Sequence, residues 1–144
     1  MRLWHKDIIP YLPKTQLLGL WRELNSIFVN EDEHILINYI YEYNKIHLYR
    51  YTICVMNEMV RRGIKIKNPY NFFSYFANED FIYSKLPLED LIELEEVFEK
   101  HHNDRYLMQC FHNLQEKYDR GQKDFTKEQY EKLLKFICEQ EKGE

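Results

Sequence analysis

The residues with the most suggestive chemistry lie in the first two dozen positions of the chain. A free α-amino group has a pKa of about 7.7–8.0, so an amine at Met1 would be partly uncharged, and therefore nucleophilic, at neutral pH. Such an amine can attack an aldehyde carbon and form a covalent imine. The alternative is that residues 1–4 form only an ordered terminus, which packs Leu3 and Trp4 against the core.

A carboxylate and a guanidinium follow in a stretch that the sequence predicts to be a helix from Thr15 to Phe28. Its apolar residues recur at the i, i+3, i+4, i+7 spacing of an amphipathic helix: Leu17, Leu20, Trp21, Leu24 and Phe28. Thr15 is expected to cap the N-terminus, and Arg22 and Glu23 fall on the face opposite the apolar side chains. A glutamate there is either a solvated surface group or an acid–base and electrostatic group in a site.

Positive charge gathers in the first half of the chain. Residues 1–70 hold ten Lys and Arg against seven Asp and Glu, a net of +3, whereas residues 71–144 hold ten against seventeen, a net of −7. The total of −4 is unusual for a nucleic-acid-binding protein, but this asymmetry is compatible with one basic face. The cations that could hold phosphate oxygens are Arg2, Lys6, Arg22, Arg61, Arg62, Lys65 and Lys67. The cluster 61–67 could equally be a helix C-terminus whose cations complement the helix dipole.

The periodic segments predict an all-α fold: a compact single domain of five to seven helices. Only four Gly and four Pro interrupt the 144 residues, which favours helices joined by short turns. Asn44 is predicted to cap a helix from Lys45 to Arg62, which ends at Gly63. The apolar face of that helix is predicted to contain Ile46, Tyr49, Ile53, Met56 and Val60. Further helices are expected at 34–43, from 69 through the aromatic run 72–76, and at 87–100, 103–120 and 126–140.

Several classes of protein are disfavoured. No apolar run approaches the length of a membrane span, and no signal-peptide pattern opens the chain, so a cytoplasmic protein without membrane contact is expected. The three cysteines have no paired spacing, which indicates reduced thiols. The residues His101, His102, Asp104, Cys110 and His112 do not match a zinc pattern, and structural histidines are the expected interpretation.

Two sequence segments resemble the phage endonuclease V type family of pyrimidine-dimer DNA glycosylases. The first comprises Met1-Arg2-Leu3, Leu12, Gln16-Leu17 and Trp21-Arg22-Glu23-Leu24, similar to the family's N-terminal Thr-Arg-Ile and its helical Tyr-Arg-Glu-Leu. The second is Arg61-Arg62-Gly63-Ile64-Lys65-Ile66-Lys67, similar to the family's Lys-Arg-Gly-Phe-Asn-Ile-Lys. The resemblance covers residues 1–68 and leaves 69–144 as an acidic helical extension. The segments 102–107 and 113–117 are similar to small uncharacterised bacterial relatives.

The resemblance implies a DNA-repair glycosylase and abasic-site lyase that acts on damaged double-stranded DNA and needs no metal or organic cofactor. The family uses its N-terminal amine as the nucleophile. Because Arg2 is too large for ordinary Met removal, Met1 itself would supply that amine here. Glu23 would stabilise the cationic imine and assist proton removal. The substrate contacts would come from Arg2, Arg22, Arg61, Arg62, Lys65 and Lys67.

The sequence also departs from this family in ways that bear on specificity. Gln16 and Ser26 stand where the phage enzyme has His and Arg, the segment from Glu23 to His34 is shorter, and the tail 139–144 lacks the family's aromatic and basic C-terminus. One alternative is a non-catalytic nucleic-acid- or protein-binding module, whose acidic half would bind a protein partner. Another is an enzyme that acts on a different modified base. The sequence leaves the lesion and the oligomeric state open.

Overall fold

The computed structural model describes residues 2–77 and 92–142. Within these residues the α-helices are α1 (Lys14–Asn30), α2 (Lys45–Arg61), α3 (Pro69–Ala77), α5 (Asp104–Asp119) and α6 (Lys127–Lys142). Three short 3₁₀ helices lie before and between them: η1 (Ile9–Tyr11), η2 (Asn38–Glu42) and η3 (Leu94–Glu96). No strand occurs in this part of the chain. The predicted all-α fold class is confirmed.

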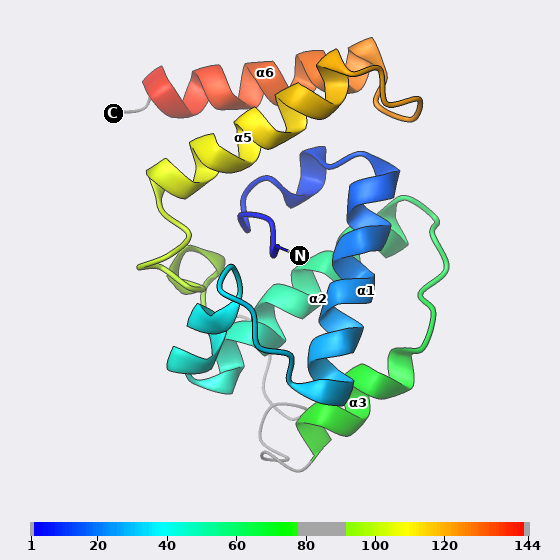
Figure 1. The fold of residues 1–144 in the computed structure, drawn as a ribbon, viewed down its shortest axis with the longest axis vertical. Helices are drawn as coiled ribbons and strands as arrows, with labels where there is room; N and C mark the ends of the chain where they lie inside the picture. Colours follow the sequence, from blue (N-terminus) through cyan, green and yellow to red (C-terminus); the bar gives the residue numbers. More distant parts are fainter. Residues whose placement is uncertain (1, 78–91, 143–144) are drawn as a thin grey trace.

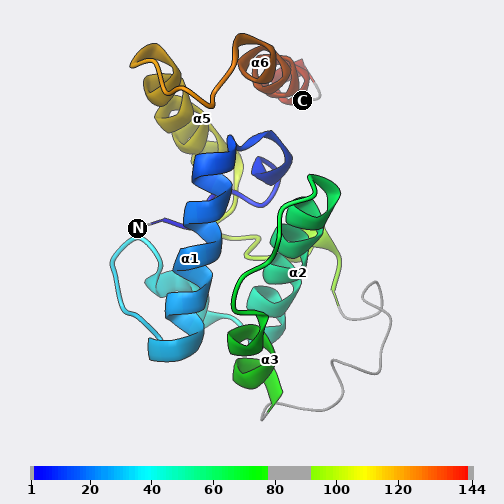
Figure 2. The same ribbon diagram turned by 90° about the vertical axis from the view of Figure 1, so that its right-hand side faces the viewer.

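The helices form two groups with the N-terminal segment between them. Helices α1, α2 and α3 pack against one another, while α5 and α6 form a helical hairpin across one end of the molecule (Figure 1). Residues 2–13 run between these two groups in both views (Figures 1 and 2). Four apolar side chains of this segment are almost completely buried: Leu3, Ile8, Ile9 and Leu12. The N-terminal segment is therefore part of the hydrophobic core.

Local capping signals set several helix ends as predicted. The side chain of Asn44 accepts a hydrogen bond from the Ile46 N–H at the start of α2, and Gly63 follows the end of that helix with a φ of 74°. Thr126 and Gln129 form a reciprocal capping box at the start of α6, with both N–H···O distances at 3.2 Å. The predicted start and stop of α5 are also confirmed by Asn103 and Gly121.

The predicted N-cap of α1 is wrong, because Pro13 occupies the cap position. Thr15 lies inside the first turn, and its N–H and hydroxyl both donate to the carboxylate of Asp124, at 2.8 and 2.7 Å. Asp124 lies in the α5–α6 turn, so a distant carboxylate satisfies one of the N–H groups that a local cap would otherwise satisfy. This contact also fixes the hairpin against the start of α1.

The buried face of α2 differs from the predicted face by one residue, a rotation of about 100°. The predicted positions end with Val60, whose side chain is 64% exposed; Ile53 and Met56 are only partly buried against the core. The residues that are buried are Leu48, Tyr51, Thr52, Val55, Glu58 and Met59. Tyr51, Thr52 and Glu58 carry polar groups, so the buried face does not stand out as an apolar pattern in the sequence.

Two further helix predictions are wrong in the described residues. Residues 34–43 form turns followed by η2, and not an α-helix. Residues 92–100 contain only η3 and turns, and Phe98 has a positive φ of 49° that interrupts helical geometry. Positions 87–91 of the predicted helix lie outside the described residues. Val97 and Phe98 are nevertheless buried as expected, with Glu95, Glu96 and Glu99 exposed.

Candidate active site

A surface cavity of about 450 Å³ opens between the N-terminal segment, α1, the loop before η2, and α5. Its polar lining combines a single carboxylate with three cations: Glu23, Arg2, Arg22 and Lys117. Trp4, Leu20 and Leu36 supply apolar surface. The cavity thus brings together Arg2, Arg22 and Glu23, three of the residues that the sequence predicts to form the site. Met1 lies outside the described residues.

Glu23 is the most unusual group in this cavity. It is half-buried on α1, between the buried side chains of Trp21 and Leu24 on one side and the exposed Arg22 on the other. Its Oε2 atom is buried and has no hydrogen-bond partner among the described residues. An unpartnered buried carboxylate oxygen costs free energy. Such an atom is expected where a substrate or a reaction intermediate supplies the missing partner.

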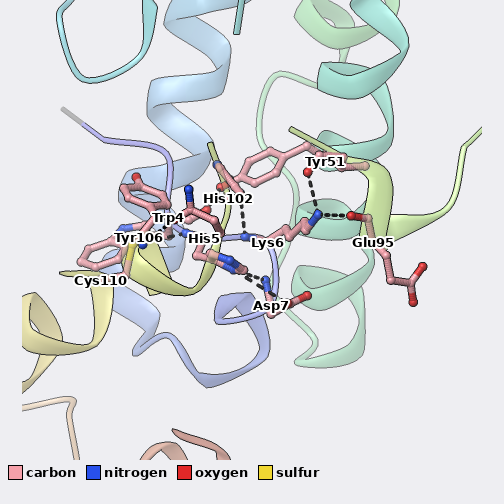
Figure 3. Close-up of polar contacts among 11 residues, drawn as sticks. Trp4, His5, Lys6, Asp7, Tyr51, Glu95, His102, Tyr106 and Cys110 are labelled. Atoms are coloured by element: carbon pink, nitrogen blue, oxygen red, sulfur yellow. Dashed lines mark hydrogen bonds and ion pairs between the residues drawn. The ribbon is translucent and has the colours of Figure 1, made fainter. Parts of the chain in front are cut away.

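Side chains from α2, α5 and the residues before α5 hold the backbone of the N-terminal segment in place (Figure 3). Tyr106 donates to the carbonyl of Leu3 at 2.5 Å, and Tyr51 donates to that of Trp4 at 2.6 Å. The next two backbone N–H groups also donate to side chains. That of His5 contacts Cys110 Sγ at 3.4 Å, and that of Lys6 contacts His102 Nδ1 at 3.0 Å. Each residue from 3 to 6 therefore has a side-chain partner far away in the sequence.

His102 is fixed in one neutral tautomer by its two partners. Because Nδ1 accepts from Lys6, the ring proton is on Nε2, which donates to the Tyr39 hydroxyl at 2.6 Å. Burial, together with the neighbouring His5 and Lys6, lowers the pKa of His102 to about 2. Burial also lowers the pKa of His5, whose ring stacks on that of His102 at 5.2 Å. Both histidines are buried and bonded within the core, and for His102 this is the interpretation expected from the sequence.

Lys6 is not part of a DNA-binding surface, so this expectation from the sequence is wrong. Its side chain is buried, and Nζ donates to the backbone carbonyls of Glu95 and Val97, at 2.5 and 2.7 Å (Figure 3). Burial lowers its pKa, against the raising effect of nearby carboxylates. The ammonium group therefore links the N-terminal segment to η3.

The remaining predicted cations divide between two surfaces. A second cavity, of about 530 Å³, is bordered by Lys14, Arg22, Arg62, Lys65 and Lys67. Arg22 lines both this cavity and the one that contains Glu23. Arg61 instead borders a third cavity, with Tyr11 and Lys132. The structure thus places Arg22, Lys65 and Lys67 next to the Glu23 cavity and separates Arg61 from it.

Arg62 has a structural function at the end of α2. Its guanidinium donates to Glu58 at 2.6 Å and to the carbonyls of Leu12 and Pro10, at 2.7 and 3.0 Å. Arg61 also pairs with the buried Glu58 carboxylate. The bonds of Arg62 use three of the five N–H donors of its guanidinium, and they join α2 to the segment before α1.

Two cations and one amide that line these cavities are not predicted from the sequence: Lys14, Lys117 and Asn113. Lys14 precedes the predicted helix, while Asn113 and Lys117 come from α5 in the acidic half. Asn113 and Lys117 are four residues apart and so share a helix face, but only the packing of α5 reveals that this face borders Glu23. Gln16 lines the same cavity, and its side-chain amide pairs with that of Gln122.

No group of three or more His, Cys, Asp or Glu side chains in residues 2–77 and 92–142 could hold a metal ion. His101 contacts the hydroxyl of Tyr43 at 2.7 Å, and His112 contacts Gln115. Over the same residues, no helix combines the length and apolar character needed to cross a bilayer.

A helical scaffold with one acid in a cavity bordered by cations defines a protein suited to a polyanionic substrate. The comparison with known families agrees. The family model for pyrimidine dimer DNA glycosylases matches residues 1–72, half of the chain, and the chain belongs to that family. No curated protein and no solved structure matches it. The matched residues include the N-terminal segment and all of α1 and α2.

Proposed function

We propose that this protein is a DNA glycosylase with abasic-site lyase activity on pyrimidine dimers or another damaged base. The α-amine of Met1 attacks C1′ of the damaged nucleotide. The N-glycosidic bond breaks, and the base leaves with the bonding electrons and takes up a proton. The sugar ring opens to a protonated imine. Loss of a C2′ proton then expels the 3′-phosphate by β-elimination, and water hydrolyses the imine to regenerate the amine.

The observation that carries this proposal is the unpartnered, buried Oε2 of Glu23 in a cationic cavity. A protonated imine is a cation with an N–H donor, and it would supply both the charge and the hydrogen bond that this oxygen lacks among the described residues. The same carboxylate is suited to accept the C2′ proton during elimination.

The N-terminal segment supports the assignment of the nucleophile. Arg2 lines the same cavity as Glu23, and Met1 is joined to Arg2 by one peptide unit, which spans about 3.8 Å between Cα atoms. The proposal requires a free α-amino group at Met1. The backbone from Leu3 to Lys6 is held by Tyr106, Tyr51, Cys110 and His102, so the segment that leads to Arg2 is fixed in place.

Phosphate binding is assigned to the cations that border the Glu23 cavity and the adjoining cavity. Arg22 lies between them and suits a phosphate next to the attacked sugar, because its planar fork matches two phosphate oxygens. Lys65 and Lys67 are exposed and extend the positive surface. Arg2 adds a further cation, and its guanidinium also lies over the Tyr106 ring at 5.8 Å. Arg61 and Arg62 act mainly through Glu58.

Trapping with borohydride tests the nucleophile directly, since borohydride reduces an imine to a stable amine. The native protein, incubated with abasic or pyrimidine-dimer duplex DNA and borohydride, should form a covalent adduct whose modified residue is Met1 by mass spectrometry. Acetylation of the α-amine, or an N-terminal tag, should abolish the adduct. If the native protein traps neither DNA, or the tagged protein still traps it, the mechanism is wrong. The binding-module alternative then takes precedence.

The role of Glu23 is tested by Glu23→Gln, which preserves size but removes the charge. Strand cleavage should fall by about 10²-fold or more, while adduct formation falls less, because the carboxylate acts mainly in elimination. Glu33→Gln is the matched control, since Glu33 is exposed and lies outside the cavity lining. Equal cleavage by the two variants would remove Glu23 from the mechanism.

A further inference from the structure

Two consecutive apolar side chains are exposed at the edge of the Glu23 cavity. Ile35 is 85% exposed and Leu36 is 42% exposed, and Leu36 lines the cavity itself. They lie in the loop between α1 and η2, which passes beside the outer end of the N-terminal segment in both views (Figures 1 and 2). Exposed aliphatic groups are common singly, but a pair next to a cationic cavity requires an explanation.

The loop that presents Ile35 is braced by its own hydrogen bonds. The His34 N–H donates to Asn38 Oδ1 at 2.6 Å, and the Leu36 N–H donates to His34 Nδ1 at 3.1 Å. The carbonyl of His34 accepts from the N–H groups of Ile37 and Asn38, both at 2.8 Å, and the side chain of Ile37 is fully buried. Ile35 is therefore held outward on an anchored turn, so little conformational entropy remains to be lost when it meets a partner.

The position of Ile35 distinguishes it from the other large exposed apolar side chains of the described residues. Ile35 directly precedes Leu36, which lines the Glu23 cavity. The other exposed apolar side chains are Val29, Tyr41, Val60, Tyr70 and Phe73, and none of them lines that cavity or precedes a residue that does. The loop at Ile35 is flanked by a cavity that contains Arg2, Arg22 and Lys117. A nucleic acid whose phosphates bind these cations would also bring its stacked bases towards Ile35.

We propose that Ile35, supported by Leu36, is a wedge that enters the DNA base stack beside the reacting nucleotide. This inference rests on the proposed function, because chemistry at C1′ within a duplex requires a nucleotide to leave the stack. The space left behind must be filled or collapse, and apolar side chains inserted between base steps perform this function in other DNA-bending proteins. The branched side chain of Ile35 would occupy that space, while Leu36 covers the cavity edge.

The wedge is tested with Ile35→Ser, with Val29→Ser as the matched control. Val29 is also β-branched and is 62% exposed. On duplex abasic DNA, Ile35→Ser should lower the rate of borohydride trapping by about tenfold or more. On single-stranded abasic DNA, which has no partner strand to unstack, it should stay within about twofold of the native protein. Ile35→Leu should restore most of the duplex rate. An equal rate for Ile35→Ser and Val29→Ser on duplex DNA would overturn the wedge.

A fluorescence measurement separates the wedge from the chemistry. A 2-aminopurine base placed beside the abasic site brightens when it unstacks, so it reports insertion without any covalent step. Glu23→Gln should brighten it, and Glu23→Gln combined with Ile35→Ser should not, at DNA concentrations that saturate both. If the probe brightens equally with and without Ile35→Ser, the wedge is wrong, while the proposed function is unaffected. Failure of the native protein to trap either DNA overturns the proposed function instead.

Discussion

The imidazole of His102 accepts a hydrogen bond from the backbone N–H of Lys6, 96 residues away in the sequence, over 3.0 Å. This bond exists only while Nδ1 of His102 is unprotonated, and burial keeps it so by lowering the pKa of the ring to about 2. The segment that leads to the proposed nucleophile is therefore held by a group whose protonation opposes folding.

This relationship predicts how stability depends on pH. In the unfolded chain His102 titrates near its ordinary pKa of 6.5, so below that pH the unfolded state binds a proton that the folded state rejects. The free energy of unfolding should fall by about 1.4 kcal/mol per pH unit below 6.5 from His102 alone. His102→Asn retains an acceptor but does not titrate, and urea unfolding at several pH values should show a correspondingly shallower dependence. Identical slopes for the two proteins would contradict the assignment.

The same substitution is predicted to lower stability at Lys6 and to weaken DNA binding at Lys65. Lys6→Met removes an ammonium group that satisfies two buried carbonyls, and should destabilise the protein by about 2 kcal/mol. Lys65→Met changes an exposed side chain at the cationic cavity. It should leave stability within about 0.5 kcal/mol and weaken DNA binding. Denaturant unfolding and DNA titration of both variants provide the comparison. A loss of DNA affinity without a loss of stability in Lys6→Met would contradict its structural role.

Sequence alone predicts the parts of this fold that depend on neighbouring residues. Asn44, Gly63 and the Thr126–Gln129 pair act within one turn of the chain, so their capping could be derived from local spacing. The face of α2 could not, because Thr52 and Glu58 are buried only after a backbone carbonyl and two arginines satisfy them. Whether these polar side chains are buried depends on their hydrogen-bond and ion-pair partners, and not on the helix propensity of each residue.

The candidate site shows the same division. The amphipathic spacing places Arg22 and Glu23 on the polar face of a helix, and the family resemblance implies their roles in a site. The missing partner of Glu23 Oε2, however, depends on the three-dimensional packing around it. The sequence does not predict the burial of Lys6, because no local pattern distinguishes a lysine that donates to backbone carbonyls near η3 from one that meets solvent. Lys117 was missed because its contribution depends on how α5 packs near α1.

Salt dependence should distinguish phosphate contacts from structural arginines. Each cation that neutralises a DNA phosphate contributes a slope of about −0.9 to the dependence of log affinity on log salt. Arg22→Gln should therefore reduce the slope by about 0.9 and leave stability nearly unchanged. Arg62→Gln should leave the slope intact and lower stability, because the buried Glu58 and two carbonyls lose a donor. Titrations at several salt concentrations, together with denaturant unfolding, provide both quantities. A reversed pattern would show that Arg62 contacts DNA.

The last prediction concerns Tyr106, whose hydroxyl holds the carbonyl of the fully buried Leu3. Tyr106→Phe retains the ring beneath Arg2 but removes the hydroxyl, which also interacts with Cys110 and Arg2, so the N-terminal segment should lose alignment more than stability. Because misplacement of a reacting group by about 1 Å can cost up to 10²-fold in rate, imine trapping should slow by about tenfold. DNA affinity should change by less than about twofold.

Tyr118→Phe, on the same helix and with its ring stacked on Tyr130 at 4.0 Å, is the control. The pH at which trapping reaches half its maximum should stay the same in Tyr106→Phe, since the amine keeps its ionisation and loses only its placement. Equal trapping rates in the two variants would show that the hydroxyl of Tyr106 contributes to folding alone.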